Sequence, residues 1–360
     1  MIYREYGQTG EKVSLLGFGG MRFKNVDDHD ECIRMMICAA EGGINYFDTA
    51  PGYFETRSET VFGKGFEELR KRNLPYLSAS KTFETTENGI RREIDAQLKR
   101  MNISAIDFYH IWSVNSLDNW QNRKKDGVLQ TFKKLKEEGL IRHICISSHL
   151  IKNEIRELLM EGVFEGVLFG YSAYNFKTRQ EAFDALREKK LGAVVMNPLG
   201  GGVIPQYPHF FNFLCRPGES AVTAALRFLW DHPEITCTLV GHDTIGHLKE
   251  TLRAMDEYKP RTQAELEEVK SKADSSFEGI CTGCAYCDDC PAGIPIPEFM
   301  DTYNQKILAT EGDKDPIGNR LRWHWNIEKS VAGKCTACGQ CEEACTQHIN
   351  IIERLKEIAG

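Results

Sequence analysis

The sequence predicts an α/β fold, in which a (β/α)8 TIM barrel precedes a small, α-rich and cysteine-rich domain. Segments typical of strands and helices alternate eight times between residues 13 and 258, which is the size and rhythm of such a barrel. Residues 259–276 are polar and charged, and eight of the 13 cysteines lie beyond them. We therefore expect a barrel over residues 1–258, a helical linker over 259–276 and a second domain over 277–360.

The predicted strands are short and apolar, and they are rich in Val, Ile, Leu, Phe and Tyr. Strands that are buried on both faces of a parallel sheet have this composition. The segments are 13–19, 46–50, 76–81, 106–114, 143–148, 167–174, 193–198 and 238–241.

A helix is predicted after each strand. Asn, Thr, Ser and Asp stand near several of the helix starts, and Gly42, Gly139 and Gly162 stand at plausible ends. An open, doubly wound sheet is the alternative, but it requires a Gly-x-Gly-x-x-Gly turn after the first strand. Residues 17–22 lack the third glycine of that turn. The predicted helices are 30–42, 58–71, 87–101, 127–138, 152–161, 179–189, 220–230 and 246–258.

The cysteines of the second domain form two compact runs of four, Cys281, Cys284, Cys287 and Cys290, then Cys335, Cys338, Cys341 and Cys345. Zinc sites use two separated Cys-x2-Cys pairs, so two [4Fe-4S] clusters fit these runs better than zinc or disulfides. Two-cluster ferredoxins use similar runs, in which the fourth cysteine ligates the other cluster. The first run has two residues before its last cysteine instead of three, and Thr346 replaces the proline that would follow the second run. The assignment of each cysteine to a cluster therefore stays open. The connector between the runs is expected to hold helices at 297–308 and 317–325.

Composition restricts the classes of partner. The net charge is −7 and no dense Lys/Arg stripe is present, which argues against nucleic-acid binding. No run of 18 apolar residues is present and the N-terminus lacks the apolar core of a signal peptide. The other five cysteines are scattered through apolar segments, where core packing in a reducing compartment is expected. We expect a cytoplasmic protein without membrane or nucleic-acid partners.

Three polar residues stand at successive strand ends of the barrel, where catalytic groups of this fold are found. Asp48 ends the second strand, Tyr53 follows it, and Lys81 ends the third. A lysine ammonium lowers the pKa of a nearby phenol, and an aspartate can hold that lysine in place. Taken alone, Asp48 could cap a helix and Lys81 could lie on the surface, but together they predict an acid catalyst.

The chain resembles the aldo/keto reductase superfamily, specifically its members with a C-terminal ferredoxin-like domain. The resemblance rests on residues 7–22, 45–50, 58–59, 63, 144–149 and 198–202, and on both cysteine runs. It implies a nicotinamide dinucleotide extended across the barrel mouth, and hydride transfer to or from a carbonyl or alcohol of a small-molecule substrate. It also implies that Asp48, Tyr53 and Lys81 belong to a catalytic tetrad in which Tyr53 donates the proton.

The fourth member of that tetrad departs from the family pattern. The family has a histidine five residues after the aspartate of the fourth strand, whereas five residues after Asp107 this chain has Trp112. His110 lies two residues earlier, on the same face of the strand but about 6–7 Å deeper in the barrel. Either a bulge brings His110 to the site or Trp112 replaces the histidine, and we favour replacement. The tryptophan N–H can donate one hydrogen bond.

The resemblance also implies a set of dinucleotide-binding residues. Ser147 and Ser148 match a Ser-Asn pair that holds the carboxamide, and the glycine-rich loop after the seventh strand would approach the pyrophosphate, although it could be a simple turn. The positions where NADP-preferring members carry Lys or Arg lack a cation here, and Asp243 would repel a 2′-phosphate, so NAD(H) is favoured over NADP(H). The implied residues are Gly20, Ser147, Ser148, Pro198, Leu199, Gly200, Gly201, Gly241, His242, His247 and Thr251.

The two halves of the chain suggest different electron chemistry. A hydride carries two electrons, whereas a [4Fe-4S] cluster carries one, so coupling them requires a flavin, a radical-tolerant substrate or a redox partner such as a ferredoxin or flavoprotein. No flavin motif is recognisable, but a flavin is not excluded. The leading hypothesis is an oxidoreductase, and the alternative is an electron-transfer or redox-regulatory protein on a catalytically altered barrel. A radical enzyme that cleaves adenosylmethionine would need a Cys-x3-Cys-x2-Cys run, which is absent.

The aromatic segments 205–215 and 320–326 either pack the two domains together or form a lid over the mouth.

Overall fold

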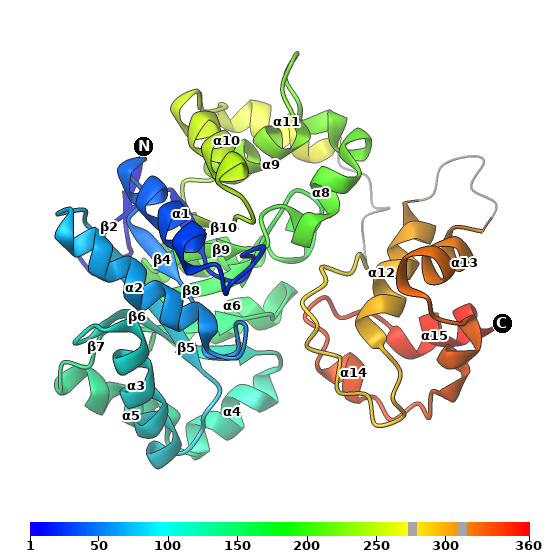
Figure 1. The fold of residues 1–360 in the computed structure, drawn as a ribbon, viewed down its shortest axis with the longest axis horizontal. Helices are drawn as coiled ribbons and strands as arrows, with labels where there is room; N and C mark the ends of the chain where they lie inside the picture. Colours follow the sequence, from blue (N-terminus) through cyan, green and yellow to red (C-terminus); the bar gives the residue numbers. More distant parts are fainter. Residues whose placement is uncertain (273–278, 309–314) are drawn as a thin grey trace.

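The larger body of the molecule is a closed barrel of eight parallel strands with helices around it (Figure 1). The computed structural model describes residues 1–272, 279–308 and 315–360. The order of neighbouring strands is β10-β3-β4-β5-β6-β7-β8-β9, which confirms the predicted TIM barrel. The strands are β3 (Leu16–Gly19), β4 (Tyr46–Asp48), β5 (Leu77–Thr82), β6 (Ile106–Val114), β7 (Ile141–Ser148), β8 (Gly166–Gly170), β9 (Gly192–Met196) and β10 (Cys237–Gly241).

The barrel helices follow the predicted order. They are α1 (His29–Glu41), α2 (Arg57–Lys71), α3 (Glu87–Met101), α5 (Val128–Glu137), α6 (Lys152–Met160), α7 (Glu181–Lys189), α9 (Ala221–Trp230) and α10 (Ile245–Asp256). The sequence analysis missed α4 (Leu117–Lys125), which is strongly polar, and two short helices at the mouth, α8 (Val203–Gln206) and η3 (Pro208–Leu214). Several helix starts are capped as expected, for instance by Thr86 and Ser220, whose side chains accept backbone N–H bonds.

The predicted first strand, 13–19, is wrong as a single element. Residues Lys12–Ser14 form β2, which pairs antiparallel with β1 (Tyr3–Glu5), and only Leu16–Gly19 enters the barrel. Tyr6, in the connection between β1 and β2, is fully buried, and the centroid of its ring lies 4.3 Å from that of Phe108 on β6. This aromatic pair fills the barrel interior, so the floor of the barrel is packed and the open end is the opposite one.

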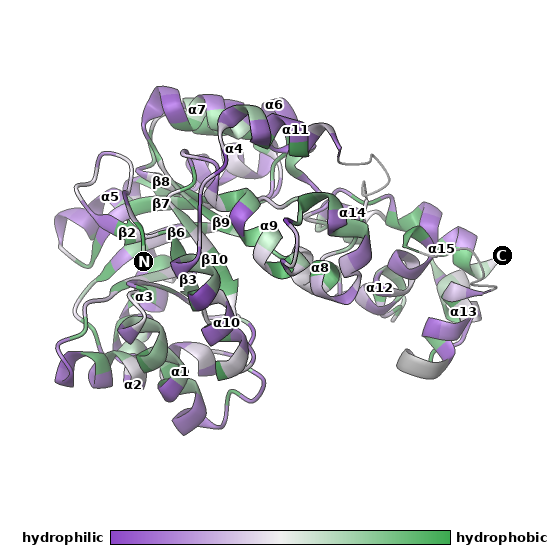
Figure 2. Ribbon diagram, turned by 90° about the horizontal axis from the view of Figure 1, so that it is seen from above, coloured by the Kyte–Doolittle hydropathy of each residue, from purple (hydrophilic) through white to green (hydrophobic). Residues whose placement is uncertain are grey.

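The rim at the carboxyl ends of the strands is set by the strand register. Gly241 on β10 pairs with Gly19 on β3, Gly19 pairs with Asp48 on β4, and Asp48 pairs with Ala79 on β5. The residues that end these strands therefore meet along one edge. The barrel strands are mostly apolar, whereas polar residues dominate the outer helix faces (Figure 2).

The cysteine-rich domain is a helical body with a core of its own, centred on Phe299, Met300, Ile351 and Leu355. Its elements are α12 (Ile296–Ile307), α13 (Pro316–Arg320), the π-helix η5 (Leu321–Trp325), η6 (Lys329–Lys334), α14 (Gln340–Glu343) and α15 (Ile351–Ala359). The helix predicted at 317–325 is thus an α-helix that continues into a π-helix. Within the predicted linker, α11 spans Gln263–Ser271, and residues 273–276 lie outside the described residues. No helix in the described part of the chain is both long and apolar enough to span a membrane.

The domain docks on the barrel through side-chain to backbone hydrogen bonds. Arg179, which is buried between the two bodies, donates to the carbonyl oxygens of Gly170 at 3.0 Å and Thr346 at 2.9 Å. His348 Nε2 lies 3.1 Å from the carbonyl oxygen of His149. His149 belongs to the loop after β7 and Arg179 to the loop after β8, so the domain sits at the open end of the barrel.

Candidate active site and cysteine pockets

A buried ion pair lies at the rim of the barrel. Lys81 Nζ donates to both carboxylate oxygens of Asp48 at 2.6 Å and to the carbonyl oxygen of Thr49 at 2.9 Å. Both side chains are buried. Burial raises the pKa of Asp48 and lowers the pKa of Lys81, and the contact with the opposite charge counteracts both shifts. The bidentate geometry holds the lysine in one orientation.

Tyr53 lies beside this pair on the loop between β4 and α2. Lys81 Nζ is 5.3 Å from the centroid of the Tyr53 ring. Burial and then the charge of Asp48 raise the pKa of the Tyr53 phenol well above its usual value. The prediction that Lys81 lowers this pKa is therefore wrong here, because burial dominates. The phenol stays protonated at neutral pH, which is the state a proton donor requires.

His110 is level with Lys81 in the sheet but faces no cavity among the described residues. It pairs with Lys81 across the β5–β6 ladder and is fully buried, with Nδ1 3.3 Å from the carbonyl oxygen of Ser80. Burial and the nearby Lys81 charge lower the pKa of His110 to about 3. Its Nε2 has no hydrogen-bond partner among the described residues.

Trp112 is the β6 residue that lies against Tyr53. The two rings meet edge to face at 5.9 Å and 88°, and Phe83 stacks on the indole at 4.0 Å. The β6–β7 register shifts between Ile111 and Val114, where Ser113 has a φ of 55°. This irregularity follows His110 in the chain and includes Trp112.

A cavity of about 430 Å³ opens above Asp48 and Tyr53. Seven of the predicted dinucleotide-binding residues line it, namely Pro198, Leu199, Gly201, Gly241, His242, His247 and Thr251. Gly20, Ser147, Ser148 and Gly200 lie outside its lining. The sequence analysis missed Arg22, His149 and Glu250 as lining residues. Arg22 and His149 end two of the segments that carry the family resemblance, but no site role was assigned to them, and Glu250 lies on α10.

The predicted residues outside the lining have structural contacts. A Cβ on Gly20 would lie 2.5 Å from Ser58 Oγ, so the backbone needs glycine there for close packing. A Cβ on Gly200, whose φ is +64°, would lie 2.7 Å from the ring of Tyr174. Ser148 Oγ donates to the carbonyl oxygen of Val114 at 3.3 Å and accepts from the N–H of Leu150 at 3.2 Å.

The cavity lining carries both signs of charge. Asp243 and Glu250 both line it, and Asp243 is paired with His247. His242 Nε2 lies 2.8 Å from Thr251 Oγ1, and burial lowers the pKa of His242 to about 3. Arg22 is the cation among the described lining residues of this cavity.

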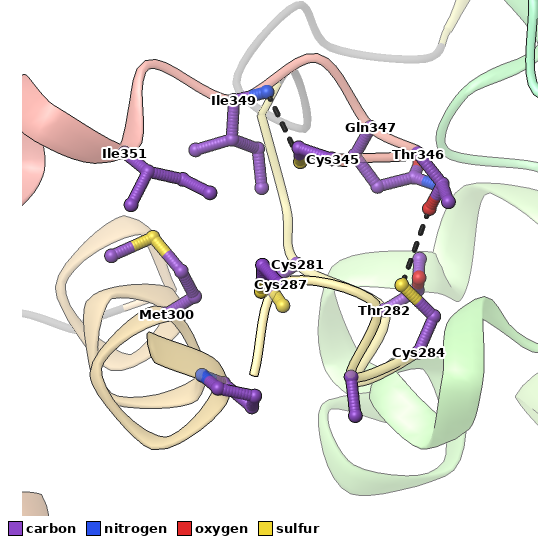
Figure 3. Close-up of a pocket in the computed structure, with 12 residues that line it drawn as sticks. Cys281, Thr282, Cys284, Cys287, Met300, Cys345, Thr346, Gln347, Ile349 and Ile351 are labelled. Carbon is purple, nitrogen blue, oxygen red and sulfur yellow. Dashed lines mark hydrogen bonds between the residues drawn. The ribbon is translucent and has the colours of Figure 1, made fainter. Parts of the chain in front are cut away.

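The eight clustered cysteines line two further pockets, and each pocket takes thiols from both runs. The first pocket is lined by Cys281, Cys284, Cys287 and Cys345 (Figure 3). The second is lined by Cys290, Cys335, Cys338 and Cys341. The last cysteine of each run therefore crosses to the pocket of the other run. Among the described residues, no three His, Cys, Asp or Glu side chains are arranged to hold a single metal ion.

The surroundings of the thiols fit a bound iron–sulfur cluster. Backbone N–H groups of Gly283, Ala337 and Ile349 each donate to a cysteine Sγ at 3.4 Å, and hydrogen bonds of this kind stabilise cluster thiolates. The hydroxyl of Thr282 lines the first pocket and has no partner among the described residues. Met300 adds an apolar wall that limits solvent access.

The first cysteine pocket adjoins the barrel cavity. Cys284 and Tyr286 line the barrel cavity as well, and Cys284 Sγ lies 3.3 Å from Thr346 Oγ1. Gly201 on the barrel has a φ of +67°, and a Cβ there would lie 2.0 Å from the carbonyl oxygen of Thr282. The cysteine loop and the glycine-rich loop are therefore in direct contact.

The described residues of the two aromatic segments have mostly packing contacts. Pro205 lines the cavity, but Phe211 and Leu214 are buried in the barrel core. Arg320 and Trp325 both donate to Asp301 on α12, within the second domain. Cys284 and Tyr286 of the first cysteine run also line the cavity.

Comparisons with known proteins match this architecture. A model of the "Aldo/keto reductase family" matches residues 15–274, and one of a "4Fe-4S dicluster domain" matches residues 280–350. L-galactose dehydrogenase of Arabidopsis thaliana is 27% identical over 302 residues, which cover 74% of this chain and 93% of that protein. NADH-specific methylglyoxal reductase of Escherichia coli (strain K12) is 26% identical over 227 residues, covering 55% and 67%.

Solved structures show the same barrel fold. The holo form of aldo-keto reductase AKR11C1 from Bacillus halodurans aligns with a TM-score of 0.65 at 24% identity, covering 76% of this chain and 97% of that one. An aldo/keto reductase from Klebsiella pneumoniae in complex with NADP and acetate aligns with a TM-score of 0.62 at 17% identity, covering 74% and 93%.

Proposed function

Since this chain belongs to the aldo/keto reductase family of oxidoreductases, we propose that it moves a hydride between a nicotinamide dinucleotide and a small-molecule carbonyl or alcohol. The observation that carries the proposal is the buried Asp48–Lys81 pair beside Tyr53 at the base of the 430 Å³ cavity. This arrangement supplies a protonated phenol next to a fixed cation, which is what proton transfer to a reacting oxygen requires.

Tyr53 is the proton donor in the reducing direction. Its hydroxyl holds the proton and releases it to the carbonyl oxygen, while Lys81 stabilises the phenolate that remains and Asp48 fixes Lys81. The bound nicotinamide supplies the hydride to the carbonyl carbon in the same direction. In the oxidising direction Tyr53 accepts the alcohol proton.

The cavity lining favours NAD(H). The carboxylates of Asp243 and Glu250 line the cavity and would repel the 2′-phosphate of NADP(H). Pro198, Leu199 and Gly201 would hold the pyrophosphate, and Gly241, His242, His247 and Thr251 the adenosine end. Gly20, Ser147, Ser148 and Gly200 would support this site from behind its lining.

A nicotinamide titration and one variant test the proposal. Methylglyoxal with NADH and L-galactose with NAD⁺ are suitable probes, since two relatives are named for these compounds. We expect NADH to bind more tightly than NADPH, and Tyr53→Phe to bind NADH normally while turnover falls at least 100-fold, on the order of general-acid contributions. Tyr3→Phe, on the exposed β1 strand, is the control. If neither NADH nor NADPH binds, the dehydrogenase function is excluded.

We further propose two [4Fe-4S] clusters, one held by Cys281, Cys284, Cys287 and Cys345, and the other by Cys290, Cys335, Cys338 and Cys341. Such clusters supply one-electron chemistry. Cys338 is exposed, so its side of the domain is where a ferredoxin or flavoprotein partner would exchange electrons. Thiolate ligands need a reducing compartment, and we place the protein in the cytoplasm. Iron and acid-labile sulfide near eight atoms each per chain would agree with two clusters.

An electron-transfer or redox-regulatory role is the second candidate, because Cys284 borders both the first cysteine pocket and the barrel cavity. Anaerobic titration with NADH separates the two candidates. Bleaching of the cluster absorption, with or without a bound flavin, would support electron transfer between cavity and cluster. Turnover of a carbonyl probe without bleaching would assign the clusters a structural role.

A further inference from the structure

The wall of the barrel cavity is completed by a residue from the other domain. Tyr286 lies between Cys284 and Cys287 in the first cysteine run, yet it lines the same cavity as Asp48 and Tyr53. Among the described lining residues that come from the second domain, Tyr286 is the one that carries a hydroxyl group. The barrel sequence alone therefore does not contain the whole active-site wall.

Two contacts from the barrel orient Tyr286. Trp112 Nε1 donates to the Tyr286 hydroxyl oxygen at 3.2 Å, and the ring of His149 meets the Tyr286 ring edge to face at 5.6 Å and 82°. An indole N–H can only donate, so the tyrosine oxygen is the acceptor in this bond. The Tyr286 proton is then left to point elsewhere, and the described residues provide no second partner for that hydroxyl.

A second donor at the reacting oxygen has a clear chemical role. Negative charge develops on a carbonyl oxygen as hydride reaches the carbon, and preorganised donors that face that oxygen lower the barrier. The Trp112 N–H already donates to Tyr286, and His110 is fully buried and absent from the described cavity lining. Tyr53 and Tyr286 both line the cavity, and Trp112 contacts both of them.

We propose that Tyr286 is a catalytic residue that donates a hydrogen bond to the same substrate oxygen as Tyr53, with Trp112 as the residue that positions it. The proposal rests on the proposed hydride transfer. The carbonyl carbon gains the hydride, the oxygen takes the proton of Tyr53, the dinucleotide is oxidised and the carbonyl is reduced. Tyr286 keeps its proton throughout, and Tyr53 is reprotonated from solvent.

The proposal gives the cysteine-rich domain a direct part in the barrel chemistry. In the sequence, Tyr286 stands between two cysteines whose thiols line the first pocket. Thr282, in the same loop, contacts Gly201. The position of the Tyr286 hydroxyl therefore depends on the fold of the cysteine loop, and no electron needs to pass from that loop to the substrate.

Acetate binding tests the donor pair independently of turnover. Its carboxylate accepts hydrogen bonds as a developing oxyanion does, and its dissociation constant can be measured by NMR titration of the holoprotein. Loss of one donor to a charged acceptor costs about tenfold or more. We therefore expect Tyr286→Phe and Tyr53→Phe each to weaken acetate binding about tenfold, and the control Tyr303→Phe to leave it unchanged. Tyr303 lies in the second domain and bonds to Glu357, away from the cavity.

Trp112→Phe separates donation by Tyr286 from loss of the Trp112–Tyr286 bond. This variant removes the N–H but keeps the Tyr286 hydroxyl, so acetate binding should weaken less than threefold. Iron content of every variant, equal to that of the native protein, shows that the cysteine loop is intact. With methylglyoxal as the probe, Tyr286→Phe should lower kcat about 100-fold while the dissociation constant of NADH changes less than twofold.

The outcomes distinguish the two proposals. Acetate affinity that is unchanged in Tyr286→Phe, or reduced equally in Tyr286→Phe and Trp112→Phe, overturns the donor role. Acetate binding that depends on Tyr286, in a protein that binds neither NADH nor NADPH, overturns the proposed function and leaves the donor site standing.

Discussion

Lys81 shows how one residue can determine both stability and chemistry at the barrel rim. Its ammonium is buried, and Asp48 and the Thr49 carbonyl oxygen satisfy it. A buried pair of this kind contributes little net stability when complete, but breaking it leaves an uncompensated charge. The side chain therefore fixes the site more than it stabilises the fold.

Replacing Lys81 by Met tests this account. We expect the free energy of unfolding to fall by about 3 kcal/mol or more, because Asp48 would be buried without its partner. The double variant Asp48→Asn with Lys81→Met should recover part of that loss. Anaerobic urea denaturation measures both, and Lys306→Met, which breaks an exposed pair with Glu357, should change stability by less than about 1 kcal/mol. Equal small losses at both lysines would contradict a structural role for the buried pair.

His110 predicts a specific pH dependence. Burial and then the Lys81 charge lower its pKa from 6.5 to about 3, so between these values the unfolded chain binds a proton that the native state does not. The contribution of neutral His110 to the free energy of unfolding is fully present above pH 6.5. It is lost as the pH falls toward 3, by up to about 1.4 kcal/mol per pH unit. His110→Gln should lose less stability than the native protein between pH 7 and pH 5 in urea titrations. Parallel losses in the two proteins would show that His110 does not carry this effect.

At the scale of elements, the contact between two loops decides how the domains meet. The glycine-rich loop before α8 lies so close to the cysteine loop that a Cβ on Gly201 would be 2.0 Å from the Thr282 carbonyl oxygen. Backbone atoms cannot move aside as a flexible side chain can. We therefore regard Gly201 as a docking residue.

Gly201→Ala is expected to loosen this contact. Gly139→Ala is the matched control, because Gly139 also has a positive φ, of +75°, but its Cβ position meets no atom of the described residues within 4 Å apart from its chain neighbours. Both variants pay the backbone cost of about 1 kcal/mol, and Gly201→Ala should in addition show faster proteolysis between the domains and weaker NADH binding. Similar behaviour of the two variants would indicate backbone strain alone.

The strand β6 shows where element-level prediction stops. Its bounds, Ile106–Val114, are those the apolar run predicts. The sequence left open whether His110 or Trp112 lies at the rim, because alternate residues of a strand share a face. The register shift after Ile111 brings Trp112 against Tyr53, and such a shift depends on the neighbouring strand and has no local sequence signal.

At the scale of the whole molecule, the two cysteine runs exchange their last members. Cys345 lines the first pocket with Cys281, Cys284 and Cys287. A chain that crosses in this way ties α12 and α15 together around both pockets. The two pockets are therefore expected to depend on each other for folding.

Single cysteine variants test the crossed arrangement. Cys345→Ser should share the electron paramagnetic resonance and redox signature of Cys281→Ser, although it lies in the other run, and should differ from Cys335→Ser. Each variant should retain about half of the native iron if the remaining cluster assembles. If Cys345→Ser instead shared its electron paramagnetic resonance and redox signature with Cys335→Ser, each run would hold its own cluster.

The sequence by itself determined the barrel, the cysteine-rich domain and the grouping of Asp48, Tyr53 and Lys81. Strand and helix periodicity is local, and parallel strands of a closed barrel must bring their carboxyl ends to one rim. The tertiary structure decided that thiols cross between runs and that Trp112 faces Tyr53. It also decided that Tyr286 reaches the barrel cavity from the second domain. These features arise from contacts between segments far apart in the chain, which packing selects and no local pattern encodes.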